Sequence, residues 1–114
     1  MQIQVLKSKI HNAFITEADV NYIGSITIDE DLMDAVNLVE GEQVHVISHR
    51  NGERLITYVI KGKRGTKEIC MNGPAALKMN KGDKVIIIAY AGMKFEAAKK
   101  FKPQIIFPKE DNSI

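Results

Sequence analysis

Eight polar residues interrupt stretches that otherwise read as apolar strands, and their side chains could bind and protonate a charged substrate. They are Lys9, His11, Tyr22, Ser25, Arg54, Thr57, Tyr58 and Asn72. Lysine and arginine bind carboxylates, and a tyrosine hydroxyl can donate a proton to a basic centre. Each residue also has a structural explanation, because long cations extend to solvent from strand ends and tyrosines place their hydroxyl at the rim of a core. Gly24-Ser25 and Asn72-Gly73 are by default turn residues.

Motifs for other kinds of chemistry are missing from the sequence. There is no glycine-rich phosphate loop, no His-x-x-x-His pair with a third ligand and no Gly-x-Ser-x-Gly nucleophile elbow. His45 and His49 are four residues apart in a strand-to-turn region. This spacing does not converge on a metal there, so we expect surface or interface histidines. The single cysteine, Cys70, excludes an internal disulfide or a thiolate cluster and is expected to be inert. The sequence therefore predicts no metal site.

Length and charge are typical of one small domain without strong affinity for polyanions. The chain has 114 residues, 45% hydrophobic and 26% charged, which predicts a single domain over residues 1–114. A net charge of +2 is too small to indicate nucleic-acid binding, and the lysines between 94 and 102 are interpreted as a solvated face. The first residues lack a signal peptide's apolar stretch, and the longest apolar run, Val85 to Ala91, is too short to span a bilayer. We therefore expect a cytoplasmic protein without membrane contact.

Alternation of apolar and polar residues predicts short strands separated by turns and two short helices. Asp29 suits the N-cap of a helix over 30–38, and Pro74 suits the first turn of a second helix over 75–79. Asn51-Gly52 predicts a two-residue hairpin. Residues 109–114 are expected to form a frayed tail. The strands are expected over residues 3–11, 23–28, 43–47, 54–60, 68–71, 85–90 and 104–107.

One pattern of apolar residues, glycine and acid occurs twice in the chain. The run A-V-x-L-x-x-G-E-x-V-x-V from residue 35 matches A-L-x-M-x-x-G-D-x-V-x-I from residue 76. Each copy predicts a short helix, a turn with glycine at positive φ, and a strand. The carboxylate after the glycine can accept backbone N–H groups that the turn leaves unpaired. Two such units related by a pseudo-twofold axis predict a small closed β-barrel.

Motifs spread along the chain carry a resemblance to a known family. They are LKSKIH from residue 6, TEAD from 16, YIGSITID from 22, NGERxxTY from 51, RG from 64, NGPAA from 72 and GDxVII from 82. Their types and spacing resemble pyruvoyl-dependent aspartate 1-decarboxylases over residues 1–107 without a gap. The resemblance implies a mainly β fold: a double-psi six-stranded β-barrel with short helices, assembled as a homotetramer with active sites between subunits. It also implies conversion of L-aspartate to β-alanine and carbon dioxide, for pantothenate and coenzyme A synthesis.

The resemblance implies that the cofactor is a covalent pyruvoyl group made from Ser25. No side chain is a good electron sink, so an amino-acid decarboxylase needs a carbonyl cofactor. The Ser25 hydroxyl is expected to attack the Gly24 carbonyl, where the absence of a Cβ tolerates strain and close approach. Elimination and loss of ammonia would then leave the fragments 1–24 and 25–114. The sequence leaves open whether this maturation is spontaneous or needs a helper protein. Three further residues are implied to take part in processing: His11, Tyr22 and Thr57.

The family's substrate-binding and catalytic residues map onto matching positions of this chain. Tyr58 is implied to return a proton to the substrate carbon after carbon dioxide leaves. Lys9 and Arg54 are implied to bind the two carboxylates. We expect the bidentate Arg54 to hold the side-chain carboxylate, because gripping the departing one would oppose its loss. The other implied substrate-binding residues are Thr57, Asn72, Gly73, Pro74 and Ala75. Position 74, often alanine in the family, is proline here, which removes one backbone N–H from the pocket rim.

The position of Thr57 conflicts with a simple reading of its strand. Alternation places Arg54 and Tyr58 on one face and Thr57 on the other. Either a bulge re-aims the chain there, or the site collects residues from two subunits.

A different function class fits the first part of the chain. From Gly24 to about residue 47 the pattern also resembles the swapped-hairpin DNA-binding domain of transition-state regulators. Those domains usually carry a basic residue after the glycine and a proline before the helix, where this chain has Ser25 and Asp29. A non-catalytic barrel is the third possibility, and it leaves Lys9, Arg54 and Tyr58 unexplained as a set.

Overall fold

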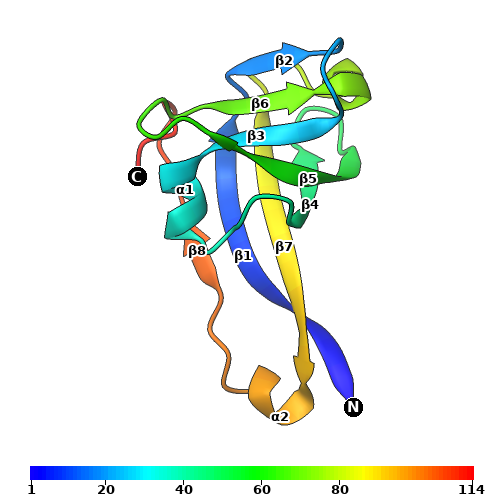
Figure 1. The fold of residues 1–114 in the computed structure, drawn as a ribbon, viewed down its shortest axis with the longest axis vertical. Coiled ribbons are helices and arrows are strands. Elements are labelled where there is room, and N and C mark those ends of the chain that lie inside the picture. The colour runs from blue at the N-terminus through cyan, green and yellow to red at the C-terminus, as the bar shows by residue number, and fades with distance from the viewer.

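Eight strands and three short helices make up the computed structural model, which describes residues 1–114 (Figure 1). The helices are α1 (Glu30–Ala35), the 3₁₀-helix η1 (Gly73–Leu77) and α2 (Phe95–Ala98). No helix is long and apolar enough to cross a membrane. The strands are β1 (Gln2–Phe14), β2 (Glu17–Asp19), β3 (Ser25–Asp29), β4 (Gln43–Ser48), β5 (Arg54–Gly62), β6 (Ile69–Asn72), β7 (Lys84–Lys94) and β8 (Gln104–Ile106).

The strands close into a barrel rather than forming an open sheet. Their hydrogen-bonded order is β2-β6-β3-β5-β4-β7-β1-β8. Strand β2 continues β1 after a break at residues 15–16, and there the Thr16 N–H donates to the Ile69 carbonyl of β6 (2.8 Å). Counting β1 and β2 as one staggered strand gives a ring of six strands, to which β8 adds in parallel on β1. The predicted six-stranded barrel is confirmed.

The repeated motif forms the two matching turns that the sequence predicts. Gly41 and Gly82 have φ values of +86° and +90°, which glycine adopts without steric cost. Glu42 and Asp83 follow them, and each carboxylate accepts a hydrogen bond from the backbone N–H three residues earlier (3.1 and 2.9 Å). The acid therefore closes its own turn in both copies.

The same turns join the two halves of the barrel symmetrically. The N–H of Gly41 donates to the carbonyl of Val59, and the N–H of Gly82 donates to that of Ile15 (2.8 and 2.7 Å). In the strands that follow, Val46 pairs with Ile87, which are equivalent positions of the repeat. The pseudo-twofold axis therefore passes between β4 and β7.

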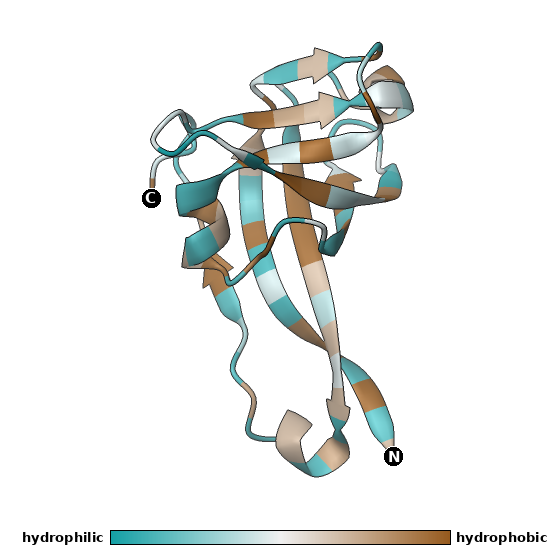
Figure 2. Ribbon diagram, in the orientation of Figure 1, coloured by the Kyte–Doolittle hydropathy of each residue, from teal (hydrophilic) through white to brown (hydrophobic).

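The core lies inside this ring and is built from the inward-facing positions of its strands. Side chains alternate between hydrophobic and hydrophilic along β1 in particular (Figure 2). The largest fully buried side chains are Ile10, Ile15, Ile26, Ile28, Met33, Ile69, Met71, Met79, Ile87, Val36, Val44 and Val46.

Strands β1 and β7 are longer than their apolar patterns predict. They pair antiparallel from Gln2 with Lys94 to Phe14 with Lys84 and extend past the other strands toward α2 (Figure 1). Residues 91–94 of β7 have their backbone paired with β1 while their side chains remain partly or fully exposed, so hydropathy gives little signal for this end of the strand. The lysines between residues 94 and 102 are exposed, as predicted. The sequence did not predict helix α2, which begins within this stretch.

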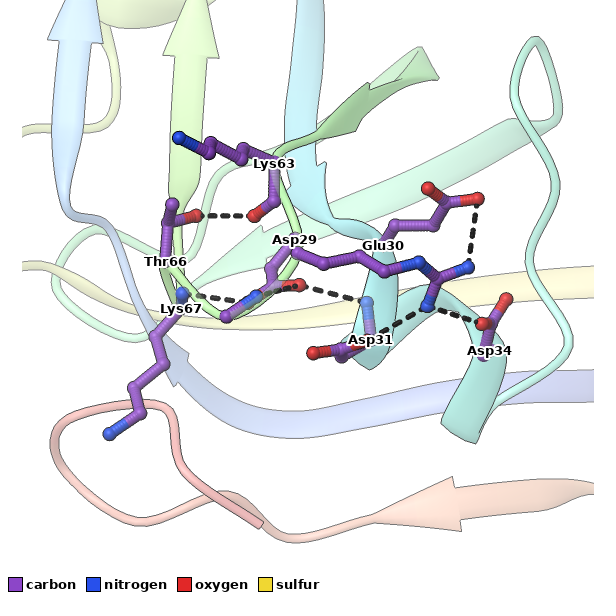
Figure 3. Close-up of polar contacts among 9 residues, drawn as sticks. Asp29, Glu30, Asp31, Asp34, Lys63, Thr66 and Lys67 are labelled. Carbon is purple, nitrogen blue, oxygen red and sulfur yellow. Dashed lines mark hydrogen bonds and ion pairs between the residues drawn. The ribbon is translucent and has the colours of Figure 1, made fainter.

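Residues 63–68, which connect β5 to β6, are hydrogen-bonded to the end of β3 and to α1 (Figure 3). The Asp29 carboxylate caps α1 through the Asp31 N–H (2.8 Å), as predicted, and also accepts from the Lys67 N–H (2.7 Å). Arg64 binds carboxylates on α1, and their hydrogen bonds raise the pKa of its guanidinium. These contacts hold β3 and β6 in fixed register. The carboxylates bound by Arg64 are those of Glu30, Asp31 and Asp34.

Three predicted turns and helix ends differ from the structure. Helix α1 ends at Ala35 rather than at residue 38, because Asn37 adopts φ +60°. The second helix is a 3₁₀-helix over 73–77 rather than 75–79, although Pro74 does lie in its first turn. The hairpin at Asn51-Gly52 forms, but residues 49–53 connect its strands instead of two residues.

The prediction of a frayed tail is wrong. Asn112 is 1% exposed and is bound to the barrel by its side chain. Its Oδ1 accepts from the Phe14 N–H (2.8 Å), and its Nδ2 donates to the carbonyls of Phe14 (2.8 Å) and Lys67 (3.0 Å). The segment is polar, as a free tail would be, but its Asn112 side chain pairs with backbone groups at the end of β1.

Removing the Asn112 side chain should therefore destabilise the fold. Asn112→Gly keeps the positive φ of 65° accessible but deletes three hydrogen bonds, so we expect a loss of about 2–3 kcal/mol in the free energy of unfolding. Urea denaturation measures it. Ser113→Ala is the matched control, because its hydroxyl bonds only the exposed Asp111. Equal midpoints for the two variants would show that the tail contributes nothing.

Candidate active site

A cavity of about 550 Å³ opens beside the first residue of β3. It gathers seven of the twelve residues that the sequence proposed for the site, from three separate segments of the chain. Its wall consists of Gly24, Ser25, Leu55, Ile56, Thr57, Tyr58, Asn72, Pro74, Ala75 and Lys78.

Ser25 is fully buried at this wall, and its hydroxyl is held by two hydrogen bonds. The hydroxyl donates to the carbonyl of Ile23 (3.1 Å) and accepts from Nδ2 of Asn72 (2.9 Å). Asn72 lies directly opposite Ser25 in the antiparallel pair of β3 and β6. A donor aimed at the hydroxyl oxygen stabilises negative charge there, which favours the serine as a nucleophile.

Ser25 and Asn72 belong to a group of four side chains on the outer face of β3 and β6. In this ladder Ser25 pairs with Asn72 and Thr27 pairs with Cys70, so the four share one face. Their neighbours in sequence, among them Ile26 and Met71, point into the core and are fully buried. We call Ser25, Thr27, Cys70 and Asn72 the polar quartet.

Gly73 lies against the backbone N and Cα of Gly24, the residue before Ser25. It has φ +71°, and a Cβ at this position would lie 2.7 Å from Cα and 2.8 Å from N of Gly24. Gly24 itself has room for a Cβ, whose nearest neighbour would be Cδ of Pro74 at 3.7 Å. The close backbone approach therefore requires glycine at 73 and not at 24. The absence of a side chain at 24 fits access to its carbonyl.

Thr57 and Tyr58 both reach the cavity although they lie on opposite faces of β5. The pairing of β4 with β5 is regular from Gln43–Tyr58 to Ile47–Arg54, so the bulge considered above is absent. Strand β3 pairs with β5 from Ile26 and Val59 onward. Tyr58 and Thr57 precede this paired stretch, so β5 has an open edge beside Ser25 and both faces are accessible.

Five of the proposed residues lie outside the cavity wall of one chain. Arg54 Nη1 contacts His45 Nδ1 on β4 (2.9 Å), a residue that does not line this cavity. Lys9 lies in one cross-strand row with Ile88, His45 and Ile56, so three steps along the sheet separate it from Ile56 in the cavity wall. The other three are His11, Tyr22 and Gly73, whose backbone lies behind Gly24.

His11 is in an environment that favours its neutral form. Its Nδ1 is buried without a hydrogen-bond partner, and its ring contacts Phe107 edge-on. Burial lowers the pKa of His11, and the nearby positive charge of Lys9 lowers it further. His49, predicted to be a surface histidine, contacts Asn12 through Nε2 (2.7 Å). No group of three His, Cys, Asp or Glu side chains is arranged to hold a metal ion.

Sequence reasoning missed three polar residues of this region. Lys78 lines the cavity just after η1, and its helical spacing from Ala75 could have indicated it. Thr27 and Cys70 each lie two residues from a proposed site residue, so strand alternation placed them on the same face as Ser25 and Asn72. Burial raises the pKa of the Cys70 thiol, which favours its neutral form.

Comparisons of sequence match the whole chain. The family model described as aspartate decarboxylase covers residues 1–114. An aspartate 1-decarboxylase of Phocaeicola vulgatus is 60% identical over 95% of this chain and 93% of the relative. Aspartate 1-decarboxylases of Flavobacterium psychrophilum and Cytophaga hutchinsonii are 58% and 57% identical, each over 100% of this chain and 99% of the relative.

Comparison of structures identifies the barrel type. The crystal structure of the rationally designed protein mkDPBB_sym_86, a double-psi β-barrel, matches with a TM-score of 0.51. The match covers 68% of this chain and 90% of the designed one at 15% identity, so it concerns the fold alone. The double-psi β-barrel predicted from the sequence is confirmed.

Proposed function

Because the chain belongs to the aspartate decarboxylase family, we propose that it makes a pyruvoyl group from Ser25 and uses it to convert L-aspartate to β-alanine and carbon dioxide. The observation that carries the proposal is the buried Ser25 hydroxyl, bound by Asn72 at a cavity that Thr57 and Tyr58 also line. β-Alanine would serve pantothenate and coenzyme A synthesis in the cytoplasm. The DNA-binding alternative rested on residues 24–47 alone, whereas the family match covers the whole chain.

Self-cleavage begins with attack of Ser25 Oγ on the carbonyl carbon of Gly24. The new C–O bond replaces the peptide C–N bond, and the hydroxyl proton passes to the leaving nitrogen. Loss of the Cα proton of residue 25 and cleavage of its Cβ–Oγ bond then release residues 1–24 as a carboxylate. Water takes the place of the freed nitrogen, which departs as ammonia. Thr57 and Asn72 supply hydroxyl and amide groups beside these atoms.

The cavity residues fit the group that this cleavage would leave. The ketone supplies the electron sink for loss of carbon dioxide. Tyr58 is 38% exposed and lines the same wall, where its phenol can deliver a proton to the substrate carbon. The η1 segment contributes Pro74 and Ala75 to the rim of the same cavity. Pro74 has no N–H, so hydrogen bonds to substrate at this rim must come from other residues.

Two copies of the chain are needed to complete the site in this proposal. Lys9 and Arg54 are the proposed carboxylate ligands, and neither lines the cavity of its own chain. The outer face of β4, β5 and β7 exposes Ile56, Tyr58 and Tyr90 at 59%, 38% and 41%, which is typical of a surface that another protein covers. A homotetramer could bring Lys9 of one subunit to the Ser25 cavity of the next. Arg54 would then hold the side-chain carboxylate of aspartate.

Denaturing mass spectrometry and product analysis test the proposed function together. The purified chain, incubated alone, should separate into fragments 1–24 and 25–114, with the second carrying a carbonyl at its new terminus. The cleaved protein should release β-alanine and carbon dioxide from L-aspartate. Cleavage only after addition of cell extract would instead show that a helper protein is required. A chain that stays intact under both conditions and forms no β-alanine would exclude the proposal.

A further inference from the structure

The polar quartet contains two groups that the proposed reaction does not use, the Thr27 hydroxyl and the Cys70 thiol, and the thiol is the one that contacts Oδ1 of Asn72. Cys70 is 8% exposed and its Sγ lies 3.1 Å from Oδ1 of Asn72. Asn72 is 3% exposed, and its Nδ2 donates to the hydroxyls of Ser25 and Thr27, both at 2.9 Å. Every polar atom of the Asn72 side chain therefore has its partner within the quartet.

The orientation of the Asn72 side-chain amide determines whether the Ser25 oxygen faces a hydrogen-bond donor or an acceptor. If the amide were rotated by 180°, Oδ1 rather than Nδ2 would face the Ser25 oxygen. Ser25 donates its proton to the Ile23 carbonyl, which leaves its oxygen lone pairs free to accept from Asn72. With a rotated amide, the Ser25 hydroxyl would have to give up its bond to Ile23 to donate to Oδ1, and its oxygen would lose the donor that stabilises charge on the nucleophile.

Cys70 favours the same orientation of the amide through its contact with Oδ1 of Asn72. A thiol is a weak donor and a weaker acceptor, so it favours Oδ1 over the NH₂ group as its neighbour. Burial, with the nearby carboxylate of Glu68, raises the pKa of Cys70 and keeps the S–H proton in place at neutral pH. The thiol and the Ser25 hydroxyl thus select the same orientation of Asn72 from opposite ends.

We propose that Cys70 is a positioning residue for self-cleavage, whose S–H holds the Asn72 amide with its donor aimed at Ser25. This inference rests on the proposed function, since it concerns the rate of the same cleavage. A donor is what position 70 requires, not sulfur chemistry. Serine should therefore replace cysteine, whereas an apolar residue of similar size should not.

The test compares cleavage rates of Cys70→Val and Cys70→Ser by denaturing mass spectrometry over time. Valine has no donor, and loss of one buried hydrogen bond of about 1.4 kcal/mol corresponds to about tenfold slower cleavage. Serine should cleave within about twofold of the unaltered chain. Cys70→Ala removes the donor without adding volume, so it should be as slow as valine even if the larger side chain perturbs folding. Ser48→Ala is the control, because Ser48 is also buried but its hydroxyl has no partner.

The outcomes separate this inference from the proposed function. Slow cleavage in the valine and alanine variants, with recovery in the serine variant and with all variants folded at the incubation temperature, supports it. Equal rates in all variants overturn it while leaving the proposed function intact. A serine variant as slow as alanine also overturns it, because sulfur or packing would then be what matters. An unaltered chain that never cleaves overturns the proposed function and this inference together.

Discussion

Ser25→Ala should give a chain that remains uncut and has no decarboxylase activity, while its fold is retained. The hydroxyl is the only group proposed to attack the Gly24 carbonyl, and an alanine methyl cannot form the C–O bond that replaces the peptide bond. Ser25 faces away from the core, since Ile26 beside it fills that space, so alanine leaves the core packing intact. The cost is limited to two hydrogen bonds, about 1–3 kcal/mol of stability.

The measurements are intact mass, product formation and melting temperature. Ser8→Ala is the matched control, because Ser8 is 1% exposed and its hydroxyl donates to the Val36 carbonyl, remote from the cavity wall. It should lose similar stability yet still cleave and turn over aspartate. Turnover that survives in Ser25→Ala, with an uncut chain, would refute the proposed origin of the cofactor.

The barrel was predictable from sequence because its determinants are local and periodic. Gly41 and Gly82 introduce turns that need positive φ, and the acids after them close those turns through hydrogen bonds within four residues. Alternation then fixes which residues of the following strands are buried. These features depend on neighbours in the chain, so a single sequence contains them. The identity of the family came instead from longer motifs, which periodicity cannot supply.

The parts that the sequence did not reveal depend on contacts between distant segments. Asn112 is bound by Phe14 and Lys67, and nothing within residues 109–114 indicates those partners. Lys9 and Arg54 fit a carboxylate site by residue type, yet the strand order separates Lys9 from Ser25 within one chain. The polar quartet is an intermediate case. Strand alternation shows that Ser25 and Thr27 share a face, but only the register of β3 with β6 shows that Cys70 lies opposite Thr27.

The site arises where the two halves of the repeat differ. Helix α1 begins at Glu30, which is equivalent to residue 71 in the second copy, whereas η1 begins only at Gly73. Because the second helix begins later, Asn72 remains in the extended conformation and pairs with Ser25. The chain turns only at Gly73, which has φ +71°. The same turn brings Gly73 against Gly24. Gly73 thus has two effects: it keeps Asn72 in position to donate to Ser25, and it packs against Gly24, whose bond to Ser25 is to be cut.

Gly73→Ala should therefore nearly abolish self-cleavage. A Cβ at this position would lie 2.7 Å from Cα of Gly24, 2.8 Å from its N and 2.9 Å from the carbonyl oxygen of Tyr22. All three are backbone atoms, so the segment before Ser25 must shift by several tenths of an ångström or more. Displacements approaching 1 Å at a reacting bond can cost about a hundredfold in rate. We expect cleavage to slow by roughly that factor, measured as the half-time of fragment 25–114 by mass spectrometry.

Gly65→Ala separates this displacement from the strain of the backbone conformation. Gly65 has φ +82°, but a Cβ there would meet nothing within 4 Å. It should lose about 1 kcal/mol of stability, as any residue forced into this conformation does, and cleave at the unaltered rate. If both variants cleave equally slowly, global destabilisation explains the effect. If Gly73→Ala cleaves normally, the contact with Gly24 does not position the bond. Slow cleavage in Gly73→Ala alone would mean that the close approach of the two glycines sets the geometry of attack.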